Sequence, residues 1–145
     1  MCSYCGCESE AAIATLMADH AEIADLVYRI RQALDAGRPD DAGLLTTRLA
    51  REFERHSRNE EAGLFRQVRL SGEGADELDR LEDDHRTLRR RLAQEKLVEQ
   101  PHRLRTLLQD LTRHAELEDN DFFPFVLQSL PDESWEALAL TVPAG

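Results

Sequence analysis

Two short stretches of the sequence carry the same arrangement of a histidine and a glutamate. The first, HSRNEEAGLF, begins at His56, and the second, HAELEDNDFF, begins at His114. In both, a glutamate follows the histidine by four residues, at Glu60 and Glu118. On a helix, this spacing puts both side chains on one face, about 6 Å apart along the axis, where they can bind one metal ion or two neighbouring ions. The repetition predicts one site built from two halves.

The elements that must position these residues are predicted to be helices. Breaks near residues 37–40, 71–74 and 99–101 divide the chain into four long segments. In each segment apolar residues recur every three or four positions, which is the period of a buried helix face. Short connections make neighbouring helices antiparallel. The sequence therefore predicts an all-α fold, an antiparallel up-down-up-down four-helix bundle with a short C-terminal helix that starts after Pro131.

Polar residues interrupt the apolar faces at positions that packing alone would give to leucine. Each predicted helix carries one such histidine, and the second and fourth also carry a glutamate: His20, His56, Glu60, His85, His114 and Glu118. About two or three positions in seven face a bundle seam, so chance would place all four histidines there in roughly 1–3% of cases. The fifth histidine, His102, lies among polar residues and is expected on the surface.

These six residues are also expected to lie at one height in the bundle. When antiparallel neighbours are folded about their turns, His20 faces position 57, Glu60 faces His85, and His85 faces position 115. Burial of two carboxylates among imidazoles carries a large desolvation penalty, which a bound cation removes. We therefore expect a metal centre in this layer.

The donor atoms limit which metals fit. Nitrogen and oxygen donors without a buried thiolate suit iron, manganese or zinc. Six donors are too many for one closed tetrahedral zinc site, and they suit two ions bridged by carboxylates. Di-iron sites built from inward-facing Glu and His side chains are a known use of four-helix bundles.

The order of these motifs resembles a known family. One histidine in the first helix, H-x3-E-E in the second, one histidine in the third and H-x3-E-D in the fourth resemble the hemerythrin-like HHE cation-binding domain, over about residues 10–128. The resemblance implies two iron ions with oxo and carboxylate bridges that meet O2, peroxide or nitric oxide. It implies as terminal ligands His20, His56, His85 and His114, and as bridging ligands Glu60 and Glu118.

The chain departs from the oxygen-carrying hemerythrins in its third helix. Those proteins have a second histidine one turn from the first, whereas the positions one turn from His85 are Leu81 and Arg89. A set of four histidines and two glutamates more closely resembles the branch linked to iron-centre repair, nitric oxide handling or iron sensing. The resemblance therefore argues against a simple oxygen store.

Three cysteines, Cys2, Cys5 and Cys7, form a CxxCxC cluster at the start of the chain. Three thiolates could hold a soft metal such as zinc with one further ligand. They could also exchange electrons or disulfides with the iron centre or with a protein redox partner. The remaining alternative is a loose tail without a function.

Four acidic neighbours of the six residues are expected to face solvent. Asp19 and Asp84 each precede a histidine of the set, and carboxylates that orient an imidazole are common at metal sites. Adjacent residues on a helix point about 100° apart, however, so solvent is the expected direction for both. Glu61 and Asp119 each follow one of the two glutamates and are expected on the solvated helix surface.

Composition limits the partners and the compartment. The net charge of −11 disfavours nucleic acid and anionic membranes as partners. No segment approaches the ~20 apolar residues of a membrane span, and the N-terminus lacks a signal-peptide pattern, so we expect a cytoplasmic protein. The sequence makes no prediction of the oligomeric state.

The predicted domain organisation has three parts. Residues 1–8 form a cysteine-bearing tail, 9–130 form the bundle, and 131–145 form the short helix and tail. The predicted function is a non-haem di-iron protein that binds or reacts with O2, peroxide or nitric oxide, or handles iron in a redox stress response. If it is an enzyme, it is a di-iron oxidoreductase. The alternative is a non-catalytic, metal-dependent sensor or interaction module.

Overall fold

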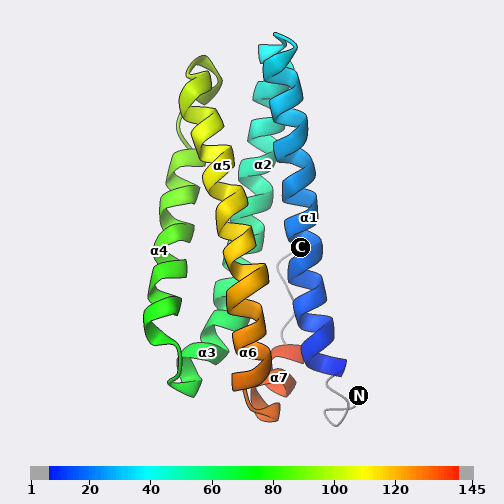
Figure 1. The fold of residues 1–145 in the computed structure, drawn as a ribbon, viewed down its shortest axis with the longest axis vertical. Helices are drawn as coiled ribbons and strands as arrows, with labels where there is room; N and C mark the ends of the chain where they lie inside the picture. Colours follow the sequence, from blue (N-terminus) through cyan, green and yellow to red (C-terminus); the bar gives the residue numbers. More distant parts are fainter. Residues whose placement is uncertain (1–6, 141–145) are drawn as a thin grey trace.

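The computed structural model describes residues 7–140, with side chains from Ser9 onward. Four long helices form an antiparallel bundle (Figure 1), and they are α1 (Cys7–Asp35), α2 (Pro39–Glu60), α4 (Ala75–Leu92) and α5 (Pro101–Leu117). Around the bundle, α1 packs against α2 and α5, and α4 packs against the same two helices. The predicted all-α bundle is confirmed.

Shorter elements extend the long helices or connect them. The π-helical turn η2 (Glu61–Phe65) and helix α3 (Arg66–Ser71) continue α2, and the π-helical turn η4 (Glu118–Phe122) and helix α6 (Phe123–Ser129) continue α5. The 3-10 turn η3 (Leu97–Glu99) precedes α5. Helix α7 (Asp132–Ala139) is the predicted short C-terminal helix. It packs against α1 at the lower end of the bundle in Figure 1.

Proline and glycine fix the ends of the helices. Pro39 and Pro101 lie in the first turns of α2 and α5, where a missing N–H group leaves no helical hydrogen bond unmade. Gly72 ends α3 with a φ of 79°, and Gly74 precedes α4 with a φ of 71°. Residues other than glycine rarely adopt this left-handed backbone conformation, so glycine at both positions allows the tight reversal between α3 and α4.

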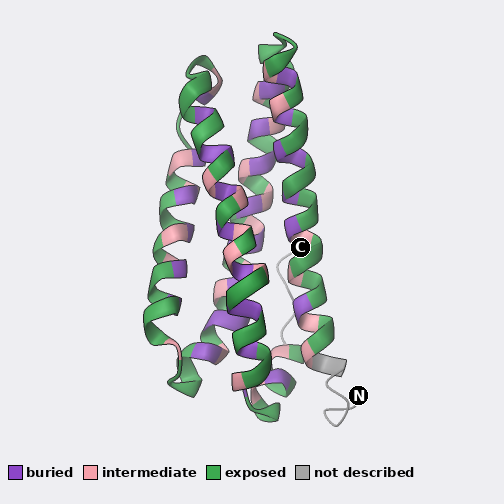
Figure 2. Cartoon of the chain, viewed as in Figure 1, coloured by how far each residue is buried: buried purple, intermediate pink, exposed green. Residues whose placement is uncertain are grey.

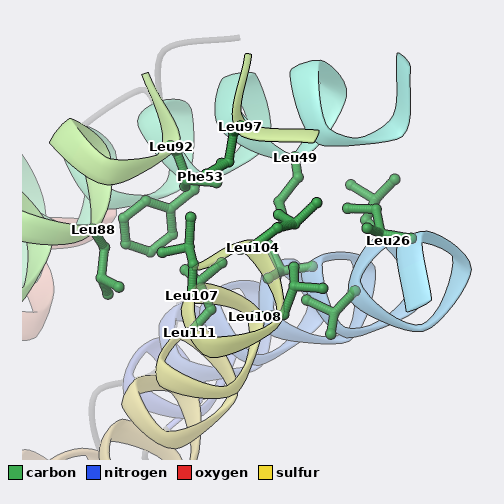
Figure 3. Close-up of a cluster of buried hydrophobic side chains, with 13 residues drawn as sticks. Leu26, Leu49, Phe53, Leu88, Leu92, Leu97, Leu104, Leu107, Leu108 and Leu111 are labelled. Atoms are coloured by element: carbon green, nitrogen blue, oxygen red, sulfur yellow. The ribbon is translucent and has the colours of Figure 1, made fainter. Parts of the chain in front are cut away.

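The interior consists of two apolar clusters, and buried residues run along the inward faces of all four long helices (Figure 2). One cluster occupies the half of the bundle nearest the α1–α2 turn, and Figure 3 shows its leucines packed between the helices, with Phe53 at one end of the cluster. The other lies toward α3, α6 and α7 and includes Trp135 of α7, which is buried. Trp135 therefore attaches the last helix to the bundle end. A layer of buried polar residues separates the two clusters.

The π-helical turns shift which residues face the core. An uninterrupted α-helical stripe through His114 and Glu118 would bury Phe122 and Phe125, but Phe125 is 36% exposed, and Phe123 and Val126 are buried together with Phe122. A π-helical turn contains one more residue than an α-helical turn, so it moves the buried face by one position. Among the described residues, no helix is long and apolar enough to cross a membrane.

Candidate metal centre

The six residues singled out from the sequence lie together in the polar layer. All of them are buried, and they come from all four sides of the bundle: His20 of α1, His56 and Glu60 of α2, His85 of α4, His114 of α5 and Glu118 of η4. His102 is exposed, as predicted. The apolar ring of Phe53 covers the layer from above, with its centroid 5.8 Å from that of His85 and 6.2 Å from that of His114.

The donor atoms form two groups that share both glutamates. One group is His20, His56, Glu60 and Glu118, the other is Glu60, His85, His114 and Glu118, and the donor atoms within each lie within 4.8 Å of one another. Oε1 of Glu60 is 3.1 Å from Nε2 of His85, while its Oε2 is 3.9 Å from Nε2 of His56. Each carboxylate therefore spans both groups, as a ligand that bridges two ions must.

Glu118 has the same relation to the two groups. Its Oε1 lies 3.0 Å from Nε2 of His20 and 3.4 Å from Nε2 of His114, and its Oε2 lies 3.9 Å from Nε2 of His85. The Nε2 atoms of His20 and His56 lie 3.1 Å apart. Four imidazole nitrogens and two carboxylates thus converge on a small buried volume.

Unsatisfied polar atoms test whether a metal fits this volume. Among the described residues, every buried side-chain nitrogen or oxygen without a hydrogen-bond partner belongs to this cluster, in Glu60, His85, His114 and Glu118. Such atoms normally cost about 1–3 kcal/mol each. Nε2 of His85 and Oε1 of Glu60 are close but not aligned for a hydrogen bond, as two ligands of one ion would be. The donor set therefore fits bound metal.

Carboxylates hold the outer nitrogens of the imidazoles. Nδ1 of His56 donates to Asp19 at 2.9 Å, and Nδ1 of His85 donates to Glu61 at 2.7 Å. A proton on Nδ1 leaves the Nε2 lone pair free to face the centre, which is the arrangement found in metal sites. Asp19 and Glu61 were expected to face solvent, and that prediction is wrong because both carboxylates reach across to the neighbouring helix.

The other two histidines have acidic neighbours of the same kind. Nδ1 of His20 donates to Asp119 at 2.7 Å. Nδ1 of His114 lies 3.5 Å from Asp84, which is longer than a normal hydrogen bond. Each of the four acids thus faces the histidine of the next helix around the bundle. The expectation that Asp119 and Asp84 only face solvent is therefore also wrong, although 43% of the Asp84 side chain is exposed.

Arginines donate hydrogen bonds to two of these carboxylates. Arg55 donates to Asp19 at 2.9 Å, and Arg89 donates to Glu61 at 2.6 Å and to the hydroxyl of Ser57 at 2.8 Å. Arg89 lies in a run of three arginines, yet only 10% of its side chain is exposed. These contacts fix the carboxylates, which in turn fix the imidazole rings.

The repeated motif also places one phenylalanine below each half of the centre. Phe65 stacks on His85 with 5.1 Å between ring centroids, and Phe123 stacks on His20 at 5.7 Å. Phe65 follows Glu60 by five residues and ends the π-helical turn η2, and Phe123 follows Glu118 by five residues, directly after the π-helical turn η4. The extra residue in each turn brings these rings against the histidines of the layer. π-helical turns are frequent at functional sites.

The electrostatics of the layer favour positive charge at its centre. Burial alone would lower the pKa of His20 and of His114. The nearby carboxylates outweigh it and raise these values to about 9 and about 10. Burial and the charge of Glu118 raise the pKa of Glu60 to about 8. Burial also lowers the pKa of His56. Protons therefore occupy positions in this layer that a cation would take.

The structure does not describe the side chains of the remaining sequence candidates, the three cysteines. Cys2 and Cys5 fall outside the described residues, and so does the side chain of Cys7, whose backbone begins α1.

Comparison with family models supplies the observation that decides the family. The model for the hemerythrin HHE cation binding domain matches residues 11–126. The chain belongs to this family. The match extends from α1 through most of α6, and so includes all six buried donors and both π-helical turns of the hemerythrin domain. Comparisons with curated proteins and with solved structures gave no match.

In this hemerythrin domain, the positions one turn from His85 hold neither a histidine nor a carboxylate. Leu81 is buried in the apolar cluster near α3, α6 and α7, and Arg89 donates a hydrogen bond to Glu61. Each of the two donor groups therefore contains two histidines and two shared glutamates.

Proposed function

We propose that this chain is a non-haem di-iron protein, with His20, His56, His85 and His114 as terminal ligands and Glu60 and Glu118 as bridges. The observation that carries the proposal is the pair of donor groups that share both glutamates. Four protein donors for each ion leave coordination positions free on a metal that takes six ligands. We further propose that the protein binds or turns over O2, peroxide or nitric oxide in a reducing cytoplasm, as part of iron or redox-stress handling.

When two iron ions are bound there, they supply electrons and open coordination positions for a small oxidant. The chain itself controls their surroundings. Phe53 packs against His85 and His114, and Phe65 and Phe123 stack on His85 and His20, so apolar rings cover part of the layer. Asp19 and Glu61, braced by arginines, keep two imidazoles in the Nδ1–H form with Nε2 toward the centre.

Metal analysis with matched variants tests the proposal. We expect about two iron ions for each wild-type chain and a loss of at least half of the iron in His56→Ala and in Glu118→Ala. His102→Ala and Glu116→Ala are the controls, because both residues are exposed on α5 and remove the same groups without touching the layer. Iron below one ion per chain in the wild type, or iron that neither ligand variant changes, would contradict the proposal.

Reactivity distinguishes a di-iron oxidoreductase from a metal-dependent sensor or interaction module. The loaded protein should show near-ultraviolet bands that change when peroxide or nitric oxide is added in excess. Turnover of many equivalents of either compound supports an enzyme. One stoichiometric change without turnover supports sensing.

We also propose a redox or zinc-binding role for Cys2, Cys5 and Cys7. Their joint replacement by serine should leave the iron content unchanged, while it lowers the zinc content or slows re-reduction of the oxidised centre. If none of these quantities changes, the cysteines have neither role.

A further inference from the structure

A polar groove between α4 and α5 leads to one of the four histidines. It has a volume of about 210 Å³, and the residues that line it include Asp84, Thr87, Arg91, Asp110 and His114. Arg91 donates to Asp110 at 2.8 Å, so these two charges neutralise each other. Among the described residues, no arginine or lysine forms an ion pair with Asp84, whereas Arg113, the other arginine of the groove, lies 3.9 Å from Asp110. Asp84 is therefore the carboxylate of the groove that neither arginine pairs with.

His114 is held less firmly than the other histidines of the centre. His20, His56 and His85 each donate from Nδ1 to a carboxylate at 2.7–2.9 Å. Both ring nitrogens of His114 are buried without a hydrogen-bond partner, and among the described residues no phenylalanine stacks face-to-face on its ring. Rotation of the His114 ring therefore breaks no hydrogen bond.

The spacing of Asp84 and His114 suits a metal ion on the groove side of the ring. The carboxylate oxygen lies 3.5 Å from Nδ1. Two donors at ~2.1 Å from one transition-metal ion subtend an angle of about 110° when they are this far apart, close to the angle of tetrahedral coordination. This distance is too long for a good hydrogen bond, but it fits two ligands of one ion.

We infer that Asp84 and Nδ1 of His114 form an outer transit site through which a divalent transition-metal ion, ferrous iron in the first place, passes into and out of the centre. The inference rests on the proposed metal-binding function of the inner layer. The ion is bound first between Asp84 and Nδ1 of His114. Rotation of the His114 ring then opens a path past it, the ion leaves Asp84 and Nδ1, and it is bound on the inner side by Nε2 and Glu118. Outward movement follows the same steps in reverse.

The groove on the opposite side of α5 provides the contrast. It has a volume of about 290 Å³, and most of the residues that line it are apolar, among them Met17, Ala24 and Val27. It reaches His20, whose ring is fixed by the hydrogen bond to Asp119 and by stacking on Phe123. The lining also includes Glu116 and Asp119, so charge does not distinguish the two grooves. The difference is that the His20 ring, which would have to move, is held on two sides.

The rate of iron release tests this route with two pairs of matched variants. Loaded protein is reduced without oxygen and mixed with excess bipyridine, and the ferrous complex is followed by its colour. Thr87→Tyr places a large side chain in the polar groove, and Thr112→Tyr places the same side chain in the apolar groove. We expect Thr87→Tyr to slow release at least fivefold and Thr112→Tyr to leave the rate unchanged.

The second pair compares the two carboxylates that lack an arginine. Asp84→Asn should slow release about fivefold, the factor that matches the ~1 kcal/mol attraction of unit charges at 4 Å in water. Asp119→Asn should accelerate it, because loss of a carboxylate that orients a ligand weakens metal binding about 10–100-fold. The opposite signs separate a transit site from a carboxylate that only positions its histidine.

Two results would overturn the inference while the metal site stands. One is faster release from Asp84→Asn, and the other is slowing by Thr112→Tyr that equals or exceeds that by Thr87→Tyr. A wild-type chain that binds no iron would instead overturn the proposed function, and the transit site with it.

Discussion

Glu60→Leu should stabilise the metal-free protein while it removes metal. In the absence of a cation, both oxygens of the buried Glu60 carboxylate lack hydrogen-bond partners. The leucine side chain has a similar volume and no polar atom to satisfy. The unpaired carboxylate thus lowers the free energy of unfolding of the metal-free protein. Its replacement by leucine should raise that free energy, although it removes a metal-binding residue.

The magnitude follows from the burial of the carboxylate. An unsatisfied buried polar group costs about 1–3 kcal/mol, and replacement of buried charged groups by apolar ones of similar size often stabilises a protein by about 1–4 kcal/mol. We expect a gain of about 2 kcal/mol in the free energy of unfolding. For a chain of this size, this gain corresponds to a rise of about 4–8 °C in Tm.

The gain should depend on pH in a defined window. The pKa of Glu60 is raised from 4.5 to about 8, so the folded state retains a proton there that the unfolded state loses above pH 4.5. The stability of the wild-type, metal-free protein therefore falls as the pH rises from about 4.5 to about 8. The advantage of Glu60→Leu should grow over this range and then level off.

Urea unfolding of chelator-treated protein, followed by circular dichroism, measures the stability, and elemental analysis of untreated protein measures the iron. Glu22→Leu is the control, because Glu22 is exposed on α1. The reasoning is refuted if Glu60→Leu destabilises the metal-free protein, or if it binds as much iron as the wild type does.

Three further predictions follow from the site. Metal binding at pH 7 should release at least about three protons, because the pKa values of His20, His114 and Glu60 lie at about 9, 10 and 8 and nearby carboxylates also raise that of His85. Calorimetry in buffers of different ionisation enthalpy measures the number of protons released, and a value near zero would contradict the assignment. The raised pKa values of His20 and His114 also stabilise the metal-free protein fully below pH 6.5, so its Tm should fall as the pH rises toward 10 while that of the loaded protein changes less. Asp19→Asn should weaken metal binding about 10–100-fold in a chelator competition, because Asp19 accepts the Nδ1–H hydrogen bond of His56. Asp25→Asn, at an exposed position of the same helix, should leave the affinity unchanged. Equal metal affinities of Asp19→Asn and the wild type would show that Asp19 has no role in orienting a ligand.

The layer of six residues could be predicted because two independent features of the sequence, helical spacing and segment length, place these residues together. Helical spacing placed His56 and Glu60 on one buried face, and the lengths of the segments placed His20, His85 and His114 at the same height. Both arguments use only the geometry of regular helices and short connections. The two donor groups confirm that these residues converge, because the four long helices are regular up to the bridging glutamates.

The π-helical turns could not be predicted, because one extra residue in a turn leaves no clear local sequence signal. This change of register explains why Phe123 is buried beneath His20 and Phe125 is partly exposed. The carboxylates were missed for another reason. A helical wheel shows the direction of Cβ, but Asp19 and Glu61 reach sideways to histidines on adjacent helices.

The motif itself contained a signal that could have found these carboxylates. An acid precedes the histidine in the first and third helices and follows the glutamate in the second and fourth, so each helix carries one acid beside a ligand. Four acids in this regular arrangement match four imidazoles that each need one Nδ1 acceptor.

The central claim is that two metal ions lie side by side between Glu60 and Glu118. Anomalous scattering at the iron absorption edge, from crystals of the loaded protein, tests it most directly. We predict two peaks about 3.5–4 Å apart, one beside His20 and His56 and the other beside His85 and His114. A single peak in this layer, or peaks only outside it, would contradict the account.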